Sequence, residues 1–195
     1  MKSYYKFSSK IYDATRWFYL LGRKPLINLI PIENQKGVNI LEIGCGTGHV
    51  LKHIQKKYDV SHIHGVDFSN DMLKKAKSKL NNNNLNLIND LYKKELYEES
   101  KFDVIVLSYA MTIINDYEKT LSSIKYHLKD DGVLAIVDFD STKYEIYTKF
   151  MKKFFVVIDP KLKKTLESNF EVVHSRSYKF LFVMWDYFHF IGKPN

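Results

Sequence analysis

The chain has 195 residues, 45% of them hydrophobic and 27% charged, which is enough for one well-filled core. A formal net charge of +8 favours a negatively charged partner, such as a lipid surface or a nucleic acid. The single cysteine, Cys45, excludes an internal disulfide, and there is neither a signal-peptide pattern nor a run of about 18 apolar residues that would span a membrane. We therefore expect a cytoplasmic protein, soluble or peripheral on the inner face of the membrane.

The first 24 residues predict a basic amphipathic helix. Lys2, Lys6 and Lys10 lie four apart on one side of it, and a second stripe is apolar, formed by Tyr4, Phe7, Ile11, Ala14, Phe18 and Leu21. One interpretation is a lid that packs this stripe on the domain, and a sharper one adds contact with an anionic membrane. We assign residues 1–30 to a lid and substrate segment and residues 31–195 to a single globular domain.

A glycine-rich turn follows the first predicted strand, Val38–Ile43, and leads into a helix from about Gly48 to Lys57. Glycines let the backbone approach a ligand closely, and the start of a helix presents free N–H groups to it. A dinucleotide fingerprint would need glycine at position 49, where this chain has His49, so the spacing disfavours a nicotinamide cofactor.

Two acidic residues end the next strands. Asp67 closes the predicted strand His62–Asp67, where a carboxylate can hold ribose hydroxyls, and Asp90 follows the strand Leu85–Asn89. A helix is expected between them at Asn70–Leu80. This alternation of strands and helices predicts a parallel sheet.

The second half of the chain continues the alternation and then changes to an antiparallel strand pair at its end. Asp130-Asp131-Gly132 is expected as a turn, and a lysine-rich helical stretch precedes the final pair. The other expected elements are a strand at Phe102–Ser108, a helix at Tyr117–Leu128, and strands at Gly132–Phe139, Phe170–Ser177 and Lys179–Phe190.

The segment Leu41–Val50, LEIGCGTGHV, resembles motif I of the class I S-adenosylmethionine (SAM) methyltransferases. The resemblance implies an α/β Rossmann-like fold, a seven-stranded mostly parallel sheet with an antiparallel C-terminal strand pair, and S-adenosylhomocysteine as the product of the cofactor. It also implies that Asp67 binds the ribose and that Asp90 lies by the adenine amine. The implied cofactor-binding residues are Glu42, Gly44, Cys45, Gly46, Thr47, Gly48, Asp67, Phe68, Met72, Asp90, Leu91 and Ser108.

Further segments resemble the small bacterial lipid N-methyltransferases, which methylate diacylglyceryl homoserine or phosphatidylethanolamine. They are Ile11–Trp17, Leu21–Arg23, Ser108–Ile114 and Val137–Phe139. This resemblance implies an enzyme that methylates the amine of a lipid headgroup. Two alternatives stay open: a methyltransferase for a soluble or quinone-like small molecule, and a SAM-binding protein without turnover.

A nucleic-acid substrate is disfavoured because the segment Leu107–Met111 lacks the prolines of the motif that stacks a flipped base. A metal site is not expected either. His49 and His53 are four apart on a helix without a third ligand, and His62 and His64 would face opposite sides of a strand. The sequence gives no indication of the oligomeric state.

An amine acceptor must lose a proton before it attacks, and Tyr12 and Tyr109 are candidate acceptors for that proton. Together with Tyr5 they could also form an aromatic cage around a quaternary ammonium product, although ordinary packing is the alternative for each. Asp138, at the end of a strand, could orient the amine or cap the next helix.

Arg16 and Arg23 are candidate substrate-binding residues. A guanidinium group offers a bidentate fork to a lipid phosphate or to the homoserine carboxylate. Surface salt bridging is the alternative for both.

Overall fold

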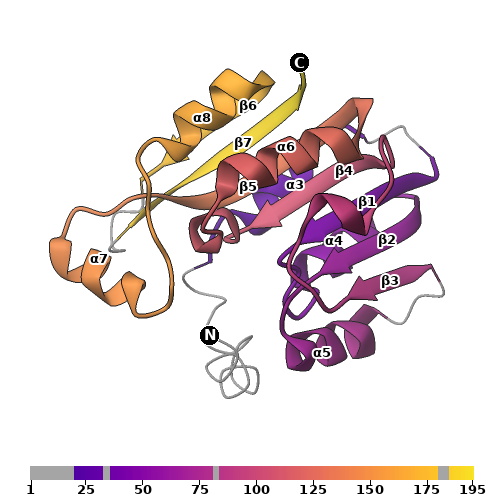
Figure 1. The fold of residues 1–195 in the computed structure, drawn as a ribbon, viewed down its shortest axis with the longest axis horizontal. Coiled ribbons are helices and arrows are strands. Elements are labelled where there is room, and N and C mark those ends of the chain that lie inside the picture. Colours follow the sequence, from indigo (N-terminus) through magenta and orange to yellow (C-terminus); the bar gives the residue numbers. More distant parts are fainter. Residues whose placement is uncertain (1–19, 33–35, 81–83, 180–184) are drawn as a thin grey trace.

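The computed structural model describes residues 20–32, 36–80, 84–179 and 185–195 (Figure 1). The predicted lid helix lies almost entirely outside these residues, and so do Tyr5, Tyr12 and Arg16. Their predicted roles therefore stay predictions.

Seven strands form one sheet in the order β3-β2-β1-β4-β5-β7-β6. β1 to β5 pair in parallel, whereas β7 runs antiparallel to both β5 and β6. This confirms the predicted fold class. The strands are β1 (Val38–Ile43), β2 (Val60–Val66), β3 (Leu85–Ile88), β4 (Phe102–Ser108), β5 (Leu128–Ser141), β6 (Phe170–Tyr178) and β7 (Asp186–Pro194).

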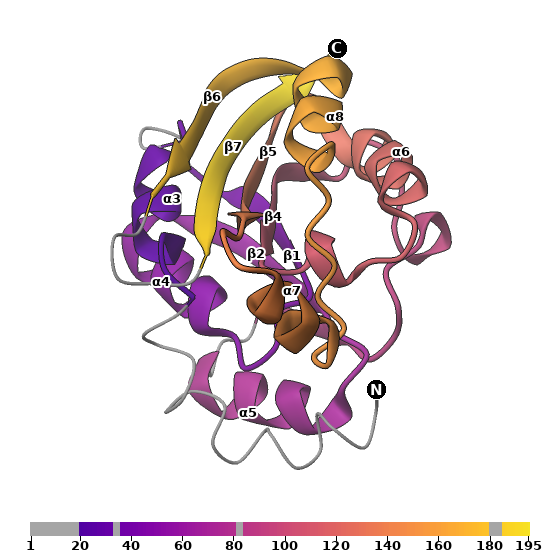
Figure 2. The same cartoon turned by 90° about the vertical axis from the view of Figure 1, so that its left-hand side faces the viewer.

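Helices cover both faces of the sheet. Figure 2 shows α3 (Arg23–Leu29) and α4 (His49–Lys57) on one side, with α6 (Tyr117–His127) and α8 (Leu162–Asn169) on the other. The remaining helical elements are α5 (Asn70–Leu80), α7 (Glu145–Lys152) and two short 3₁₀ helices, η1 (Lys94–Leu96) and η2 (Met111–Ile113). The core is correspondingly layered: Ile27 and Ile54 lie in one buried cluster, and Leu121 and Leu166 lie in another.

The central strands read as continuous apolar runs because both of their faces are covered. Every residue from Val104 to Leu107 in β4 is fully buried, and so is every residue from Leu134 to Val137 in β5. This pattern is typical of parallel strands between two helical layers. Burial of both faces holds the sheet in place beneath the loops that follow the carboxyl ends of its strands.

Two predicted elements differ substantially from the structure, and several others differ by one or two residues at an end. Residues 130–132 belong to β5, where they form a register shift, since Leu128 pairs with Phe102 and Val133 with Val104. The last strand starts at Asp186 and runs to Pro194, because β7 follows β6 along its whole length and Pro194 pairs with Phe170. Pairing with another strand set these limits, and the sequence pattern within each strand does not contain that information.

Candidate functional site

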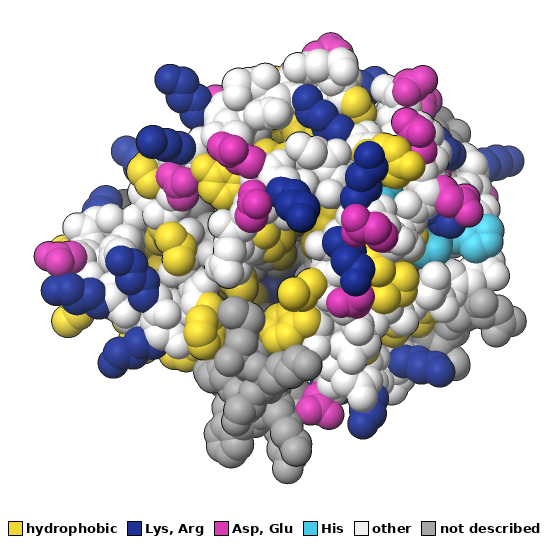
Figure 3. Space-filling view, in the orientation of Figure 1, with side chains coloured by type: hydrophobic (Ala, Val, Ile, Leu, Met, Phe, Trp, Pro, Cys, Tyr) yellow, Lys and Arg dark blue, Asp and Glu magenta, His cyan; other side chains and the backbone are white. Residues whose placement is uncertain are grey.

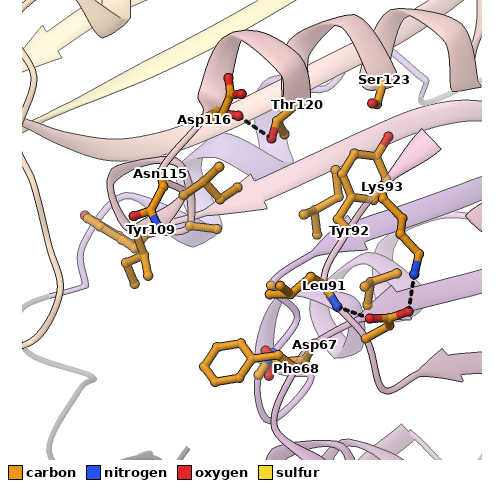
Figure 4. Close-up of a pocket in the computed structure, with 18 of the residues that line it drawn as sticks. Asp67, Phe68, Leu91, Tyr92, Lys93, Tyr109, Asn115, Asp116, Thr120 and Ser123 are labelled. Carbon is orange, nitrogen blue, oxygen red and sulfur yellow. Dashed lines mark hydrogen bonds and ion pairs between the residues drawn. The ribbon is translucent and has the colours of Figure 1, made fainter. Parts of the chain in front are cut away.

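A cavity of about 540 Å³ opens at the carboxyl edge of the parallel strands. It lies where the strand order reverses between β1 and β4, which is where open α/β sheets bind their ligands. Figure 4 shows Asp67, Phe68 and Leu91 along one wall, with Tyr109, Asn115 and Asp116 across from them. Loops after β1, β2, β3 and β4 therefore all contribute to it.

Most of the predicted cofactor-binding residues gather here. Those lining the main cavity are Gly44, Gly46, Asp67, Phe68, Met72, Asp90, Leu91 and Ser108. A narrower adjoining hollow shares Gly44, Gly46 and Ser108, and adds Glu42, Cys45 and Thr47 together with Arg23 and His49. Gly48 lines neither space.

The glycine turn has left-handed backbone at Gly44, Gly46 and Gly48, and the last two need glycine for different reasons. Gly46 has φ +50° and open space where a side chain would project, so the ligand side of the turn stays clear. Gly48 has φ +72°, and a Cβ there would lie 3.1 Å from Cβ of Ala76 in α5. Gly46 therefore leaves room for a ligand, whereas Gly48 lets α4 pack against α5.

Asp67 holds the glycine turn in place. Its Oδ2 accepts a hydrogen bond of 2.8 Å from the Gly46 amide, and its Oδ1 accepts one of 2.9 Å from the Ser69 amide. Burial raises the pKa of this carboxyl, and the two amides oppose that shift. The carboxylate is thus fixed at the cavity wall with lone pairs left for a ligand.

Asp90 occupies a different environment at the rim. Its Oδ2 pairs with the Lys93 ammonium at 2.8 Å and its Oδ1 accepts from the Leu91 amide at 2.8 Å. The hydrogen bond from Lys93 lowers the pKa of this exposed carboxyl. Leu91 itself is 67% exposed, so an apolar side chain stands free at the cavity rim.

The narrow hollow contains a buried carboxyl group. Burial raises the pKa of Glu42 well above its usual range, while the positive charge of Arg23 opposes the shift. Among the described residues, Glu42 Oε2 has no hydrogen-bond partner. Arg23 thus lies beside the cofactor-side hollow, and this placement differs from the substrate contact predicted for it. Cys45 is buried there too, and burial raises the pKa of its thiol, so it stays protonated.

Tyr109 forms part of the opposite wall in a strained left-handed conformation, with φ +55°. Its hydroxyl donates to the Leu21 carbonyl at 2.7 Å, and its ring lies 4.6 Å from that of Phe139. Burial raises the pKa of the phenol well above its usual range. This geometry gives no support to Tyr109 as a proton acceptor, although its ring does face the cavity.

Asp138 does not line the cavity but supports its wall from behind. Its Oδ1 accepts from the Thr112 hydroxyl at 2.7 Å and from the Phe139 amide at 2.8 Å, and its Oδ2 accepts from the Thr112 amide at 3.2 Å. Burial raises the pKa of Asp138 to about 6. The carboxyl group is fully buried and holds η2, so neither expected role, orienting an amine or capping the next helix, matches its position.

Several lining residues carried no prediction. Tyr92 and Lys93 lie two and three residues after Asp90, so their position after a parallel strand was the available signal. Asn115 lies just before α6, and Lys119 and Ser123 lie within it, so all three reach the cavity because of how that helix packs. No local motif identifies them.

The described ranges contain no group of three or more His, Cys, Asp and Glu residues arranged to hold a metal ion. His53 Nδ1 lies 2.8 Å from the His49 carbonyl oxygen, and His62 contacts Asn39. In the same ranges, no helix combines the length and the apolar character needed to cross a bilayer.

A family profile described as a methyltransferase domain matches residues 16–176. A malonyl-[acyl-carrier protein] O-methyltransferase from Bacillus anthracis is 31% identical over 117 residues, covering 59% of this chain and 43% of that protein. A demethylmenaquinone methyltransferase from Listeria welshimeri is 25% identical over 142 residues, covering 71% and 59%. The chain therefore spans about half the length of these relatives.

A solved structure of similar fold is the 1,6-didemethyltoxoflavin-N1-methyltransferase of Burkholderia thailandensis, with bound substrate and S-adenosylhomocysteine. It has a TM-score of 0.70 and 17% sequence identity, and the match covers 97% of this chain and 86% of that one. At this identity the likeness supports the fold alone.

Proposed function

The chain belongs to the class I SAM-dependent methyltransferase family, and we propose that it transfers a methyl group from SAM to an apolar small-molecule acceptor. The observation that carries the proposal is the cavity over the glycine turn. It joins a polar hollow suited to an amino acid, a carboxylate suited to a ribose, and a wall that includes apolar side chains.

The lining of the polar hollow is chemically complementary to the methionine part of SAM. Arg23 offers a guanidinium group to a carboxylate, and the unpartnered Oε2 of Glu42 offers an acceptor to an ammonium group. The carboxylate and the ammonium group of a bound amino acid would therefore each meet a complementary polar group. The hollow shares Gly44, Gly46 and Ser108 with the main cavity, so one ligand can extend from the first space into the second.

The main cavity fits the adenosine part. Asp67 is fixed at the end of β2 by two backbone amides, and it can accept from ribose hydroxyls with its remaining lone pairs. Phe68 and Leu91 lie on the same wall, where apolar surfaces can flank an adenine ring. Asp90 lines the same cavity, and its carboxylate could accept a hydrogen bond from the adenine amine.

The acceptor would bind against the opposite wall, formed by Tyr109, Ala110, Ile113 and Ile114. This wall is mainly apolar, which favours a planar or hydrocarbon-like molecule over a strongly charged one. The two relatives described above act, by their names, on malonyl-[acyl-carrier protein] and on a demethylmenaquinone. They support the small-molecule alternative better than the lipid-amine hypothesis drawn from the sequence resemblance.

Bound SAM would supply a methyl group that its sulfonium centre has already activated. The protein then contributes alignment and exclusion of water. Asp67 and Glu42 would fix the two ends of the cofactor, while Tyr109 and Ile113 would cover the acceptor side. The Tyr109 hydroxyl already donates a hydrogen bond to the Leu21 carbonyl. We therefore assign Tyr109 to shaping the wall and not to proton transfer.

Mass spectrometry of reaction products tests the proposal. The full chain would be incubated with SAM and, separately, with a demethylated quinol, a malonyl group on acyl carrier protein, and vesicles containing diacylglyceryl homoserine or phosphatidylethanolamine. We expect a mass gain of one methyl group in the quinol-type compound. Methylation of lipid amines alone would overturn the assignment of the acceptor, and SAM binding without product from any acceptor would favour a protein without turnover.

A further inference from the structure

The segment between β5 and α8, residues 142–161, forms a projection that carries α7 away from the sheet. Figure 1 shows α7 at the left-hand end of the molecule. Its buried side packs Met151 and Val156 into the core. We call the outward side, formed by exposed residues of this segment, the α7 face.

The α7 face exposes large apolar side chains. Ile146 and Phe150 are one helical turn apart, so they project from the same side of α7. Five of the nine exposed large apolar residues of the described chain lie here: Tyr144 (60%), Ile146 (71%), Phe150 (49%), Phe155 (39%) and Val157 (57%). Such a concentration marks an interaction surface more often than a solvated one.

Lysines surround these apolar side chains. Between residues 142 and 164 the chain carries seven lysines and only two acidic residues, Glu145 and Asp159. Lys149 and Lys153 are one turn apart, next to Ile146 and Phe150 on the helical wheel. Figure 3 shows yellow apolar and dark blue basic side chains intermixed over the end of the molecule where α7 lies.

Phe155 gives independent support. It follows α7 in the left-handed conformation, with φ +64°, which is costly for a bulky side chain and cheap for glycine. Its ring nevertheless stays 39% exposed. A partly exposed aromatic ring at a strained position contributes little to the stability of the free protein. We therefore expect the Phe155 ring to contribute when a partner binds the α7 face.

The α7 face connects with the wall of the cavity. The Val157 amide donates to the Thr112 carbonyl at 2.7 Å, and the Thr112 hydroxyl donates in turn to Asp138. Thr112 belongs to η2, whose Ile113 lines the cavity. A partner bound to the α7 face would therefore lie next to the proposed acceptor site.

We propose that the α7 face docks on an anionic lipid bilayer. Exposed apolar and aromatic side chains can enter the boundary between headgroups and acyl chains, and the lysines can reach lipid phosphates. A nucleic acid would satisfy the lysines but leave Ile146 and Val157 in water. Docking is independent of the acceptor proposed above, because it requires no methyl transfer.

Co-sedimentation of the full chain with vesicles tests docking directly. We expect binding to vesicles of equal parts phosphatidylglycerol and phosphatidylcholine, and much weaker binding to phosphatidylcholine alone. Replacing Lys149 and Lys153 by Gln should weaken binding to the anionic vesicles by roughly five-fold for each lysine. The matched control replaces Lys52 and Lys56, two exposed lysines one turn apart on α4, and should bind like the unchanged protein.

Two further variants separate docking from folding. Phe155→Gly removes an exposed ring while relieving the left-handed backbone, so it should lower vesicle binding without lowering the melting temperature. Ile146→Ser with Phe150→Ser should weaken binding to anionic vesicles, whereas Val172→Ser on β6, also exposed, should not. The proposal is overturned if these variants bind like their controls. It is overturned too if the α7 lysines prove necessary for binding an acidic carrier protein and vesicles are not bound.

Discussion

Residues 38–91, which we call the cofactor half, and residues 108–161, the acceptor half, face each other across the cavity but are built differently. In the cofactor half, the key contacts join a turn to the strand beside it, as when the Gly46 amide donates to Asp67. In the acceptor half they join segments far apart in the chain, as when Tyr109 donates to Leu21 and Val157 to Thr112. The first half is specified by local backbone chemistry, and the second by long-range packing.

We therefore assign the two halves different roles: the cofactor half binds SAM, and the acceptor half supports the wall of the acceptor site. Glycines and a strand-end carboxylate form a site for one kind of ligand wherever this turn occurs. The acceptor wall depends on a buried carboxyl group, a strained tyrosine and the projecting segment 142–161, each of which can change without altering the turn. We therefore expect substitutions in the cofactor half to change SAM affinity, and those in the acceptor half to change stability or acceptor use.

Gly46→Ala and Gly48→Ala should give the largest effects. They should also distinguish ligand binding from helix packing within the cofactor half. A methyl group at Gly46 would project into open ligand space, so SAM affinity should fall by on the order of 100-fold, while unfolding free energy falls by only about 1 kcal/mol. Gly48→Ala meets Ala76 and should cost about 2–3 kcal/mol of stability. Calorimetric titration and thermal unfolding would measure both. Equal affinity losses in the two variants would contradict the distinction.

Asp138→Asn tests the buried support of the acceptor half. Because burial raises the pKa of Asp138 from 3.8 to about 6, the folded protein binds a proton more tightly than the unfolded chain. Stability relative to the variant should therefore be greatest below pH 4 and fall by roughly 3 kcal/mol as the pH rises to about 6. Urea unfolding across this range measures it. His64 and His189 are present in both proteins, so their titration cancels in the comparison.

A constant difference in stability between pH 4 and pH 7 would contradict this account of Asp138. A difference that increases in favour of the unchanged protein as the pH rises would do so as well. Either result would mean that the hydrogen bonds from Thr112 and Phe139 outweigh the cost of burying the charge.

Tyr109→Phe should have a smaller effect. Loss of the hydrogen bond to Leu21 should lower the unfolding free energy by about 1 kcal/mol and leave the methyl-transfer rate within about three-fold. Tyr58→Phe is the matched control, since the Tyr58 hydroxyl is also buried and donates to a backbone carbonyl, that of Ile27. A rate loss of about 100-fold or more, confined to the Tyr109 variant, would restore the tyrosine as a proton acceptor.

Asp90→Ala should give the smallest effect on the cofactor. The carboxylate is exposed and already paired with Lys93, so we expect SAM affinity to fall by only about three-fold. Calorimetric titration measures this as well. A loss as large as that of Gly46→Ala would move the main anchor of the cofactor from β2 to β3.

The cofactor half could be predicted from the sequence almost to the residue. The limits of β1 and α5 match the predicted ones, because glycines, strand-end acids and apolar runs are local signals. The gathering of Gly46, Asp67 and Asp90 around one cavity also follows from the rule that parallel strands end at a common edge.

The acceptor half could not be predicted in the same way. Nothing local to Asp138 shows that it faces Thr112 instead of the cavity, since the orientation depends on how η2 packs on β5. Likewise, Lys119 and Ser123 line the cavity because of the position of α6 beside the loop after β3. The sequence resemblance to lipid N-methyltransferases rested partly on this half, in Ser108–Ile114 and Val137–Phe139, and partly on segments before residue 24. The two relatives described above act, by their names, on other acceptors.

Calorimetric titration of SAM into the unchanged protein and into Asp67→Ala tests the central claim most directly. The claim is that the cavity at the carboxyl edge binds SAM through the carboxylate that also fixes the glycine turn. We predict measurable binding to the unchanged protein and a loss of on the order of 100-fold in the variant, because both the ribose contact and the support of Gly46 are removed. Equal affinity in the two proteins, or no binding to either, would contradict the account.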